Sequence, residues 1–128
     1  LELEEAGATV LGVPPGPDGR VDLREAMAAV AREGLLSVLA EGGPRLATSL
    51  LNAELVDRVA FFLAPRLYGS EGQEALAELR PEWWSGRWRL EETSWRETGG
   101  DLLLEADVTY GTGTETSEEE HRFVHGTR

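Results

Sequence analysis

The residues best suited to chemistry lie in one short stretch, residues 37–51. An apolar run ends at Glu41, two glycines follow, and Pro44 begins a segment whose apolar residues share one helical face. Adjacent glycines let a backbone turn sharply and approach a ligand closely. Proline suits the first helical position, where its missing N–H costs nothing. Because a helix start carries unpaired N–H groups and the positive end of the dipole, the stretch predicts a phosphate-binding turn.

Glu41 adds a second chemical group to this turn. It would lie at the carboxyl end of a strand, where open α/β sheets bind their ligands. A simpler interpretation stays open, because many strand-to-helix turns use glycine and bind nothing, and this pattern is looser than a full dinucleotide fingerprint or P-loop. A site built from Glu41, backbone amides and Arg45 would suit a bound cofactor that carries the chemistry itself.

Other catalytic arrangements find little support in the chain. The only histidines, His121 and His125, lie near the end, so a Ser-His-Asp triad is not expected. Two histidines four residues apart could chelate a metal on a helix, but a mobile tail is the favoured interpretation, and we expect no metal site. There is no cysteine, and all 12 basic residues are arginine, so thiolate and lysine mechanisms are excluded within this chain.

Composition narrows the class of protein further. With 128 residues the chain predicts one domain, and its net charge of −12 argues against binding to nucleic acid or to an anionic membrane. No apolar run approaches the roughly 20 residues of a membrane span, and no signal peptide is recognisable at the start. We therefore expect a cytoplasmic protein.

Hydrophobic periodicity predicts an α/β arrangement in the first half of the chain. Asp22 with Glu25 forms a capping-box pattern at the start of one helix, and Gly34 marks its end. The second helix is the one that begins at Pro44. The alternation of strands and helices predicts a mostly parallel sheet flanked by helices. The expected strands are residues 8–13, 35–40 and 59–64.

The last third of the sequence predicts a C-terminal antiparallel hairpin with one wet face. Its arms are residues 88–97 and 102–110, and the turn between them contains two glycines. The tryptophans could form a stacking platform, but covering a sheet face or a subunit contact is the favoured interpretation. They are Trp83, Trp84, Trp88 and Trp95. Residues 111–128 are rich in Gly, Thr, Ser and Glu and predict an acidic flexible tail.

Three segments together resemble a known family. They are Ser-Val-Leu-Ala-Glu-Gly-Gly-Pro at 37–44, Leu-Val-Asp at 55–57 and Ala-Pro-Arg-Leu-Tyr-Gly at 64–69. In these segments the chain is similar to the reductase domain of the bacterial bifunctional riboflavin-biosynthesis proteins, which belongs to the dihydrofolate-reductase-like superfamily. The resemblance runs from about residue 5 to residue 110, so we expect a reductase domain over 1–110 and the tail over 111–128.

The resemblance implies a reaction and a set of roles. The family uses NADPH to reduce the ribosyl group of 5-amino-6-(5-phosphoribosylamino)uracil, a phosphorylated pyrimidine, to the ribityl product of riboflavin biosynthesis. Glu41 matches the acid that contacts the substrate beside the nicotinamide, with no catalytic residue assigned. The residues that match the cofactor-binding segment, which cradles the pyrophosphate, are Gly42, Gly43, Pro44, Arg45, Leu46, Ala47, Thr48 and Ser49.

The chain departs from the family pattern in two ways that bear on these assigned roles. The chain matches only the later part of the reductase domain, so we expect the N-terminal part to be missing. Glu54 stands where relatives often have glycine, and it would be strained if the position needs a positive φ. The alternatives are a non-catalytic module that self-associates through the tryptophan-bearing hairpin, and a folate- or pterin-type reductase. A homo-oligomer is expected both for the riboflavin-biosynthesis reductase and for the self-associating module.

Overall fold

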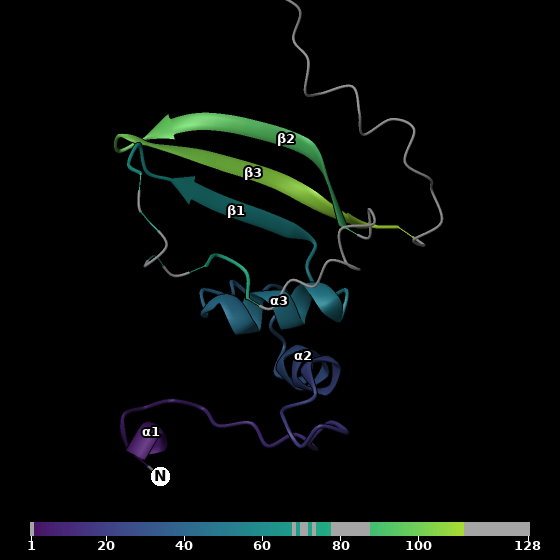
Figure 1. Ribbon diagram of the computed structural model, residues 1–128. Helices are drawn as coiled ribbons and strands as arrows, with labels where there is room; N and C mark the ends of the chain where they lie inside the picture. The colour runs from purple at the N-terminus through teal and green to yellow at the C-terminus, as the bar shows by residue number, and fades with distance from the viewer. Residues whose placement is uncertain (1, 68, 70–71, 73, 78–87, 112–128) are drawn as a thin grey trace, which may run out of the picture. The chain divides into compact units, whose positions relative to one another are not determined.

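The computed structural model describes residues 2–67, 69, 72, 74–77 and 88–111. The chain divides into two compact units, the first formed by Leu1–Leu55 with Glu74–Ala77 and the second by Val56–Gln73 with Glu78–Arg128. Figure 1 shows the helices of the first unit and the strands of the second. Several residues of interest lie outside the described residues. These are Trp83, Trp84, His121, His125 and the tail beyond residue 111.

The first unit contains α1 (Glu2–Glu5) and α2 (Leu23–Arg32). The capping residue of α2 is Asp22, whose carboxylate accepts hydrogen bonds from the N–H groups of Arg24 at 2.9 Å and Glu25 at 3.2 Å. The helix ends before Gly34, which has a φ of 81°. Both ends of α2 were predicted from the sequence and are confirmed, because they depend only on local chemistry.

The helix α3 (Pro44–Asn52) follows the Gly-Gly turn, with proline at its first position as predicted. Its inner face buries Thr48, Leu50 and Leu51. The Arg24 guanidinium donates to the carbonyl of Ala53, the C-cap of α3, and so links the two helices. The apolar spacing thus predicted the inward positions of Leu50 and Leu51, whereas Leu46, expected on the same face, is 39% exposed and Thr48 is buried instead.

The expected strands at residues 8–13 and 35–40 are wrong in this structure. Neither segment forms a strand, and the apolar side chains of the second are exposed, with 101% exposure for Leu36 and 81% for Leu39. An apolar run shows that a segment favours burial, but it becomes a strand only where a neighbour pairs with its backbone groups. Within the described residues these two segments have no such neighbour apart from an isolated bridge at Pro15, just beyond the first.

The second unit is an antiparallel sheet of β1 (Arg58–Leu63), β2 (Trp88–Thr98) and β3 (Asp101–Tyr110), in the order β1-β3-β2. The hairpin is confirmed, and Gly99 and Gly100 have φ values of 62° and 91°, as a two-residue type I′ turn requires. The strand at 59–64 is also present, but it pairs antiparallel with β3. The mostly parallel sheet is not confirmed, because all strand pairs among the described residues are antiparallel.

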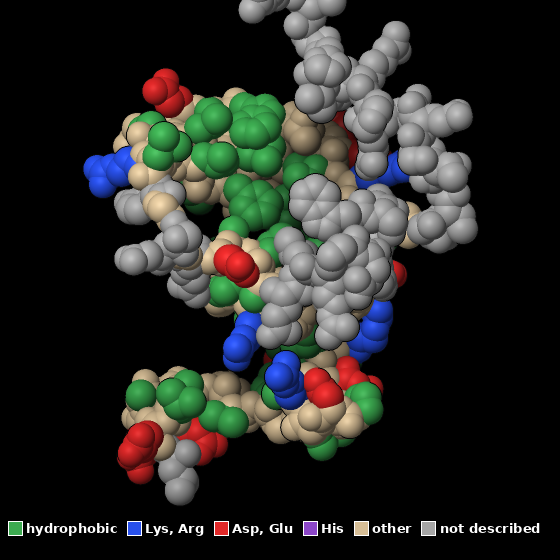
Figure 2. All heavy atoms as spheres, in the orientation of Figure 1, with side chains coloured by type: hydrophobic (Ala, Val, Ile, Leu, Met, Phe, Trp, Pro, Cys, Tyr) green, Lys and Arg blue, Asp and Glu red, His purple; other side chains and the backbone are tan. Residues whose placement is uncertain are grey.

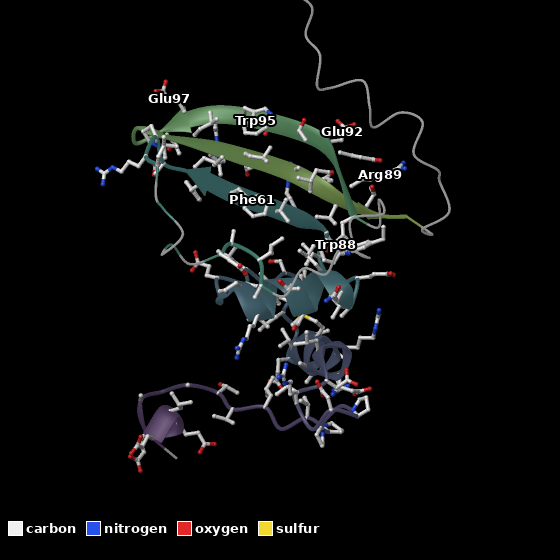
Figure 3. All side chains as sticks on the ribbon, in the orientation of Figure 1. Phe61, Trp88, Arg89, Glu92, Trp95 and Glu97 are labelled. Carbon is white, nitrogen blue, oxygen red and sulfur yellow. The ribbon has the colours of Figure 1, made fainter. Side chains whose placement is uncertain are left out.

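The two faces of the sheet differ in chemistry. One face, which we call the apolar face, carries Phe61 of β1, Leu104 of β3 and Trp95 of β2 in a single row (Figure 3). Hydrophobic side chains gather over the strands in Figure 2. On the other face, Arg58 pairs with Asp107 at 3.3 Å and Arg96 with Glu105 at 3.2 Å.

A β-bulge in β2 determines which residues reach the apolar face. The register shifts by one residue between Glu91 and Ser94, and Glu92 inside the shift has a φ of 47°. Before the bulge Leu90 lies opposite Val108, and after it Trp95 lies opposite Leu104. The extra residue thus brings an even-numbered leucine and an odd-numbered tryptophan to one face.

Candidate functional site

The turn before α3 is shaped by close contact at one glycine and by open space at the next. A Cβ added to Gly42 would lie 2.5 Å from Cδ2 and 3.2 Å from Cβ of Leu46, so any side chain there would displace this leucine. Gly43 has a φ of −67° and a ψ of 176°, and a Cβ there would meet no atom within 4 Å. Gly42 therefore permits close packing, whereas Gly43 leaves the helix start bare.

The first turn of α3 has no side-chain cap. Gly43 is the N-cap and offers no side-chain acceptor, and Pro44 has no N–H. The N–H groups of Leu46 and Ala47 both donate to the carbonyl of Gly43, at 3.0 Å and 3.2 Å. The amide donors of these two residues are thus used within the helix, and an anion would rely on the helix dipole and on the donors nearer the turn.

Charged side chains of both signs flank the turn. Glu41 precedes the two glycines and Arg45 is the second residue of α3, and both are exposed. A guanidinium in the first helical turn can pair with phosphate through two N–H groups, and a neighbouring carboxylate can accept from a hydroxyl or an N–H. The arrangement is therefore able to bind a ligand that carries a phosphate and a hydrogen-bond donor.

The predicted cofactor segment divides into two parts with different surroundings. The structure brings the residues from Glu41 to Arg45 together at the turn, where all but Pro44 are exposed. Leu46 through Ser49 form the body of the helix, where Thr48 is only 5% exposed. Its hydroxyl accepts a hydrogen bond from the N–H of Ala77 at 3.0 Å. The Thr48 side chain is thus engaged inside the first unit.

Sequence reasoning missed the contact of Ala77 with α3. Ala77 is 29 positions from Thr48, its partner on α3, and it lies in a segment without regular structure. The one local signal was a threonine among the apolar positions of an amphipathic helix, which implies a partner for its hydroxyl. Asn52, at the other end of α3, has a buried side-chain oxygen without a hydrogen-bond partner.

Metal-binding groups and membrane-spanning helices are both absent from the part of the chain that the structure describes. No group of three or more His, Cys, Asp or Glu side chains there is arranged to hold a metal ion. Likewise, no helix among these residues has the length and apolar character needed to cross a membrane.

Comparison with known proteins then places the chain. The model of the RibD C-terminal domain matches residues 2–104. The chain belongs to this family. The match covers the Gly-Gly turn, α3 and most of the sheet, and the domain of this family is dihydrofolate-reductase-like.

Two curated relatives agree with this assignment. Over 59 residues the chain is 37% identical to the riboflavin biosynthesis protein RibD of Escherichia coli (strain K12). This alignment covers 46% of this chain and 16% of that protein. Over 79 residues it is 32% identical to the riboflavin biosynthesis protein RibD of Chlamydia muridarum (strain MoPn / Nigg), covering 62% of this chain and 20% of that protein. The chain thus spans about a fifth or less of the relatives it matches.

Proposed function

We propose that this chain contributes to an NADPH-dependent reductase domain of riboflavin biosynthesis. Its reaction would be reduction of the ribosyl group of 5-amino-6-(5-phosphoribosylamino)uracil to the ribityl product. The observation that carries the proposal is the bare turn at Gly42 and Gly43 before α3, in a chain whose family contains riboflavin-biosynthesis reductase domains. The names of the two RibD relatives support the pathway.

The residues of the turn fit the pyrophosphate of a dinucleotide. Gly42 lies close to Leu46, so the backbone replaces a side chain there, and Gly43 places no atoms before the helix start. The positive end of the α3 dipole and the Arg45 guanidinium would stabilise the negative charge. We assign the pyrophosphate to this turn, and the segment from Gly42 to Ser49 positions it.

Glu41 would act on the substrate side of the turn. Its carboxylate is exposed beside the glycines, where it can accept a hydrogen bond from a ring N–H or a sugar hydroxyl. When bound, NADPH supplies the hydride that goes to the C1 carbon of the sugar. The role proposed for Glu41 is to orient the substrate and to favour positive charge near it, with no proton transfer assigned.

The experiment that tests this function is a calorimetric titration of the chain with NADPH, with NADH as the comparison. Saturable binding of NADPH is the expected result. A folded chain that takes up neither nucleotide would contradict the proposed function. A preference for NADPH would indicate a contact to the 2′-phosphate within this chain.

A second candidate, self-association through the hairpin, rests on a different observation. Four side chains on the apolar face of the sheet remain between 40% and 55% exposed, namely Leu63, Leu90, Trp95 and Leu102. Exposed apolar side chains grouped on one face are typical of contact surfaces. Sedimentation velocity at several concentrations would detect a homodimer, and Trp95→Arg would weaken it. An oligomeric reductase would satisfy both candidates.

A further inference from the structure

Among the described residues, Thr48 is the one polar or charged residue that is buried, with 5% of its surface exposed. It lies on the inner face of α3 with Leu50 and Leu51, where a valine would have nearly the same shape but no polar group. A buried hydroxyl lowers stability unless it has a hydrogen-bond partner. Here the partner is the N–H of Ala77 at 3.0 Å.

Ala77 ends a short segment that returns to the first unit. Residues 74–77 belong to that unit, although the chain on both sides of them belongs to the second. The segment has no helix or strand, so its backbone N–H groups cannot be satisfied by a regular ladder. Leu76 and Ala77 are half-buried, whereas Glu74 and Ala75 are exposed. The hydroxyl of Thr48 thus fixes the more buried end of this segment against α3.

The contact lies close to the proposed cofactor turn. Thr48 follows Pro44 by four residues, which is about 6 Å along a helix at about 1.5 Å per residue. A change in how α3 packs at Thr48 therefore acts on the helix only about one turn from its start. The hydroxyl is buried and already accepts a hydrogen bond from Ala77, so it does not contact a ligand directly. It can affect a ligand only through the position of α3 and of residues 74–77.

We infer that Thr48 is a positioning residue for the cofactor turn, and that its hydroxyl acts by holding residues 74–77 on the second turn of α3. The inference rests on the proposed function for its cofactor part, while the hydrogen bond to Ala77 stands on the structure alone. It reassigns Thr48 from contact with the cofactor, which the family resemblance implied, to support of the residues that make such contact.

The test compares Thr48→Val, which removes the hydroxyl and keeps the shape, with Thr48→Ser, which keeps the hydroxyl. Hydrogen exchange of the Ala77 amide and the Kd for NADPH are measured on each variant of the full chain. We expect Thr48→Val to exchange at Ala77 at least tenfold faster and to bind NADPH at least threefold more weakly. Thr48→Ser is expected to restore both values. Thr98→Val, the same change at an exposed position of β2, serves as the matched control.

A second variant removes the donor instead of the acceptor. Ala77→Pro lacks the N–H and leaves α3 untouched, so it is expected to weaken NADPH binding by a similar factor. The double variant is expected to be no weaker than either single one. Unchanged exchange at Ala77 in Thr48→Val would overturn the hydrogen-bond role, and lost protection with an unchanged Kd would overturn the positioning role. If the unmodified chain fails to bind NADPH, the proposed function and the cofactor part of this inference fall, while the exchange result still decides the hydrogen bond.

Discussion

The helices α2 and α3 end in opposite ways. At the start of α2, the carboxylate of Asp22 accepts from two N–H groups of the first turn, whereas Gly43 at the start of α3 provides no side-chain cap. At the other end, α2 is followed by Gly34 with a φ of 81°, and α3 by Glu54 with a φ of 56°. Each helix has a glycine where the other has an acid.

The contrast shows that α2 has the end residues that favour helix stability, whereas α3 lacks them. An aspartate N-cap and a glycine after the last turn are both preferred at the ends of a helix and stabilise it. In α3 the glycine N-cap, which forgoes a side-chain cap, also keeps the helix start uncovered and leaves no carboxylate on the cap residue itself. Natural sequences tend to depart from local preference where a site requires it. The comparison thus supports a ligand role for the start of α3 and a structural role for α2.

The largest effect is expected from giving α3 the cap that α2 has. Gly43→Asp fits, because the φ of −67° resembles the −70° of Asp22 and no atom lies within 4 Å of a new Cβ. The carboxylate would occupy the first turn and repel phosphate. We expect NADPH affinity to fall at least tenfold, which is about 1.4 kcal/mol, in a calorimetric titration.

The controls for this variant separate charge from shape and position. Gly43→Asn has nearly the shape of aspartate without its charge and is expected to lose less affinity. Gly12→Asp adds the same charge at another open glycine whose φ is not positive, and it is expected to bind as the unmodified chain does. Wild-type affinity in Gly43→Asp would place the nucleotide elsewhere, and the contrast between the two helix starts would lose its functional meaning.

Removal of the cap from α2 is the next largest change. Asp22→Ala leaves the N–H groups of Arg24 and Glu25 without their acceptor and is expected to lower the free energy of unfolding by about 1 kcal/mol. Urea denaturation measures the loss, and faster exchange of those two amides locates it. Asp22→Ser retains a cap and should recover most of the stability. NADPH affinity should be unchanged in both variants, since a large drop would make α2 part of the site.

Local signals made both helices predictable from the sequence. Asp22, Gly34, Pro44 and the pair Gly99–Gly100 each act on neighbouring residues, so their effects are visible without knowledge of the fold. The concern about Glu54 was also correct, because the helix does require a positive φ there. For the site, the same local chemistry predicted an open turn at Gly43.

Features that depend on distant residues escaped prediction. The apolar run at residues 35–40 favoured a buried strand, but its sequence does not encode the partner that would pair with it. The direction of β1 is set by β3, about 45 residues later, and not by β1 itself. The bulge at Glu92 and the bond from Ala77 to Thr48 likewise arise only once distant segments meet.

The smallest effect is expected at the C-terminal ends of the two helices. After α3, Glu54 donates its N–H to the carbonyl of Leu51 and Leu55 donates to that of Leu50, which is a Schellman motif with glutamate in the position that favours glycine. A left-handed residue other than glycine costs about 1 to 2 kcal/mol. Against this, glycine gains about 0.4 to 1 kcal/mol of unfolded-state entropy. Glu54→Gly should therefore raise the free energy of unfolding by about 0.5 to 1 kcal/mol, measured by urea denaturation. Gly34→Glu should lower it by a similar amount, because it transfers the same strain to α2. If both variants instead left stability unchanged, contacts of the glutamate side chain would be offsetting the strain, and only the N-terminal half of the contrast between α2 and α3 would have an energetic basis.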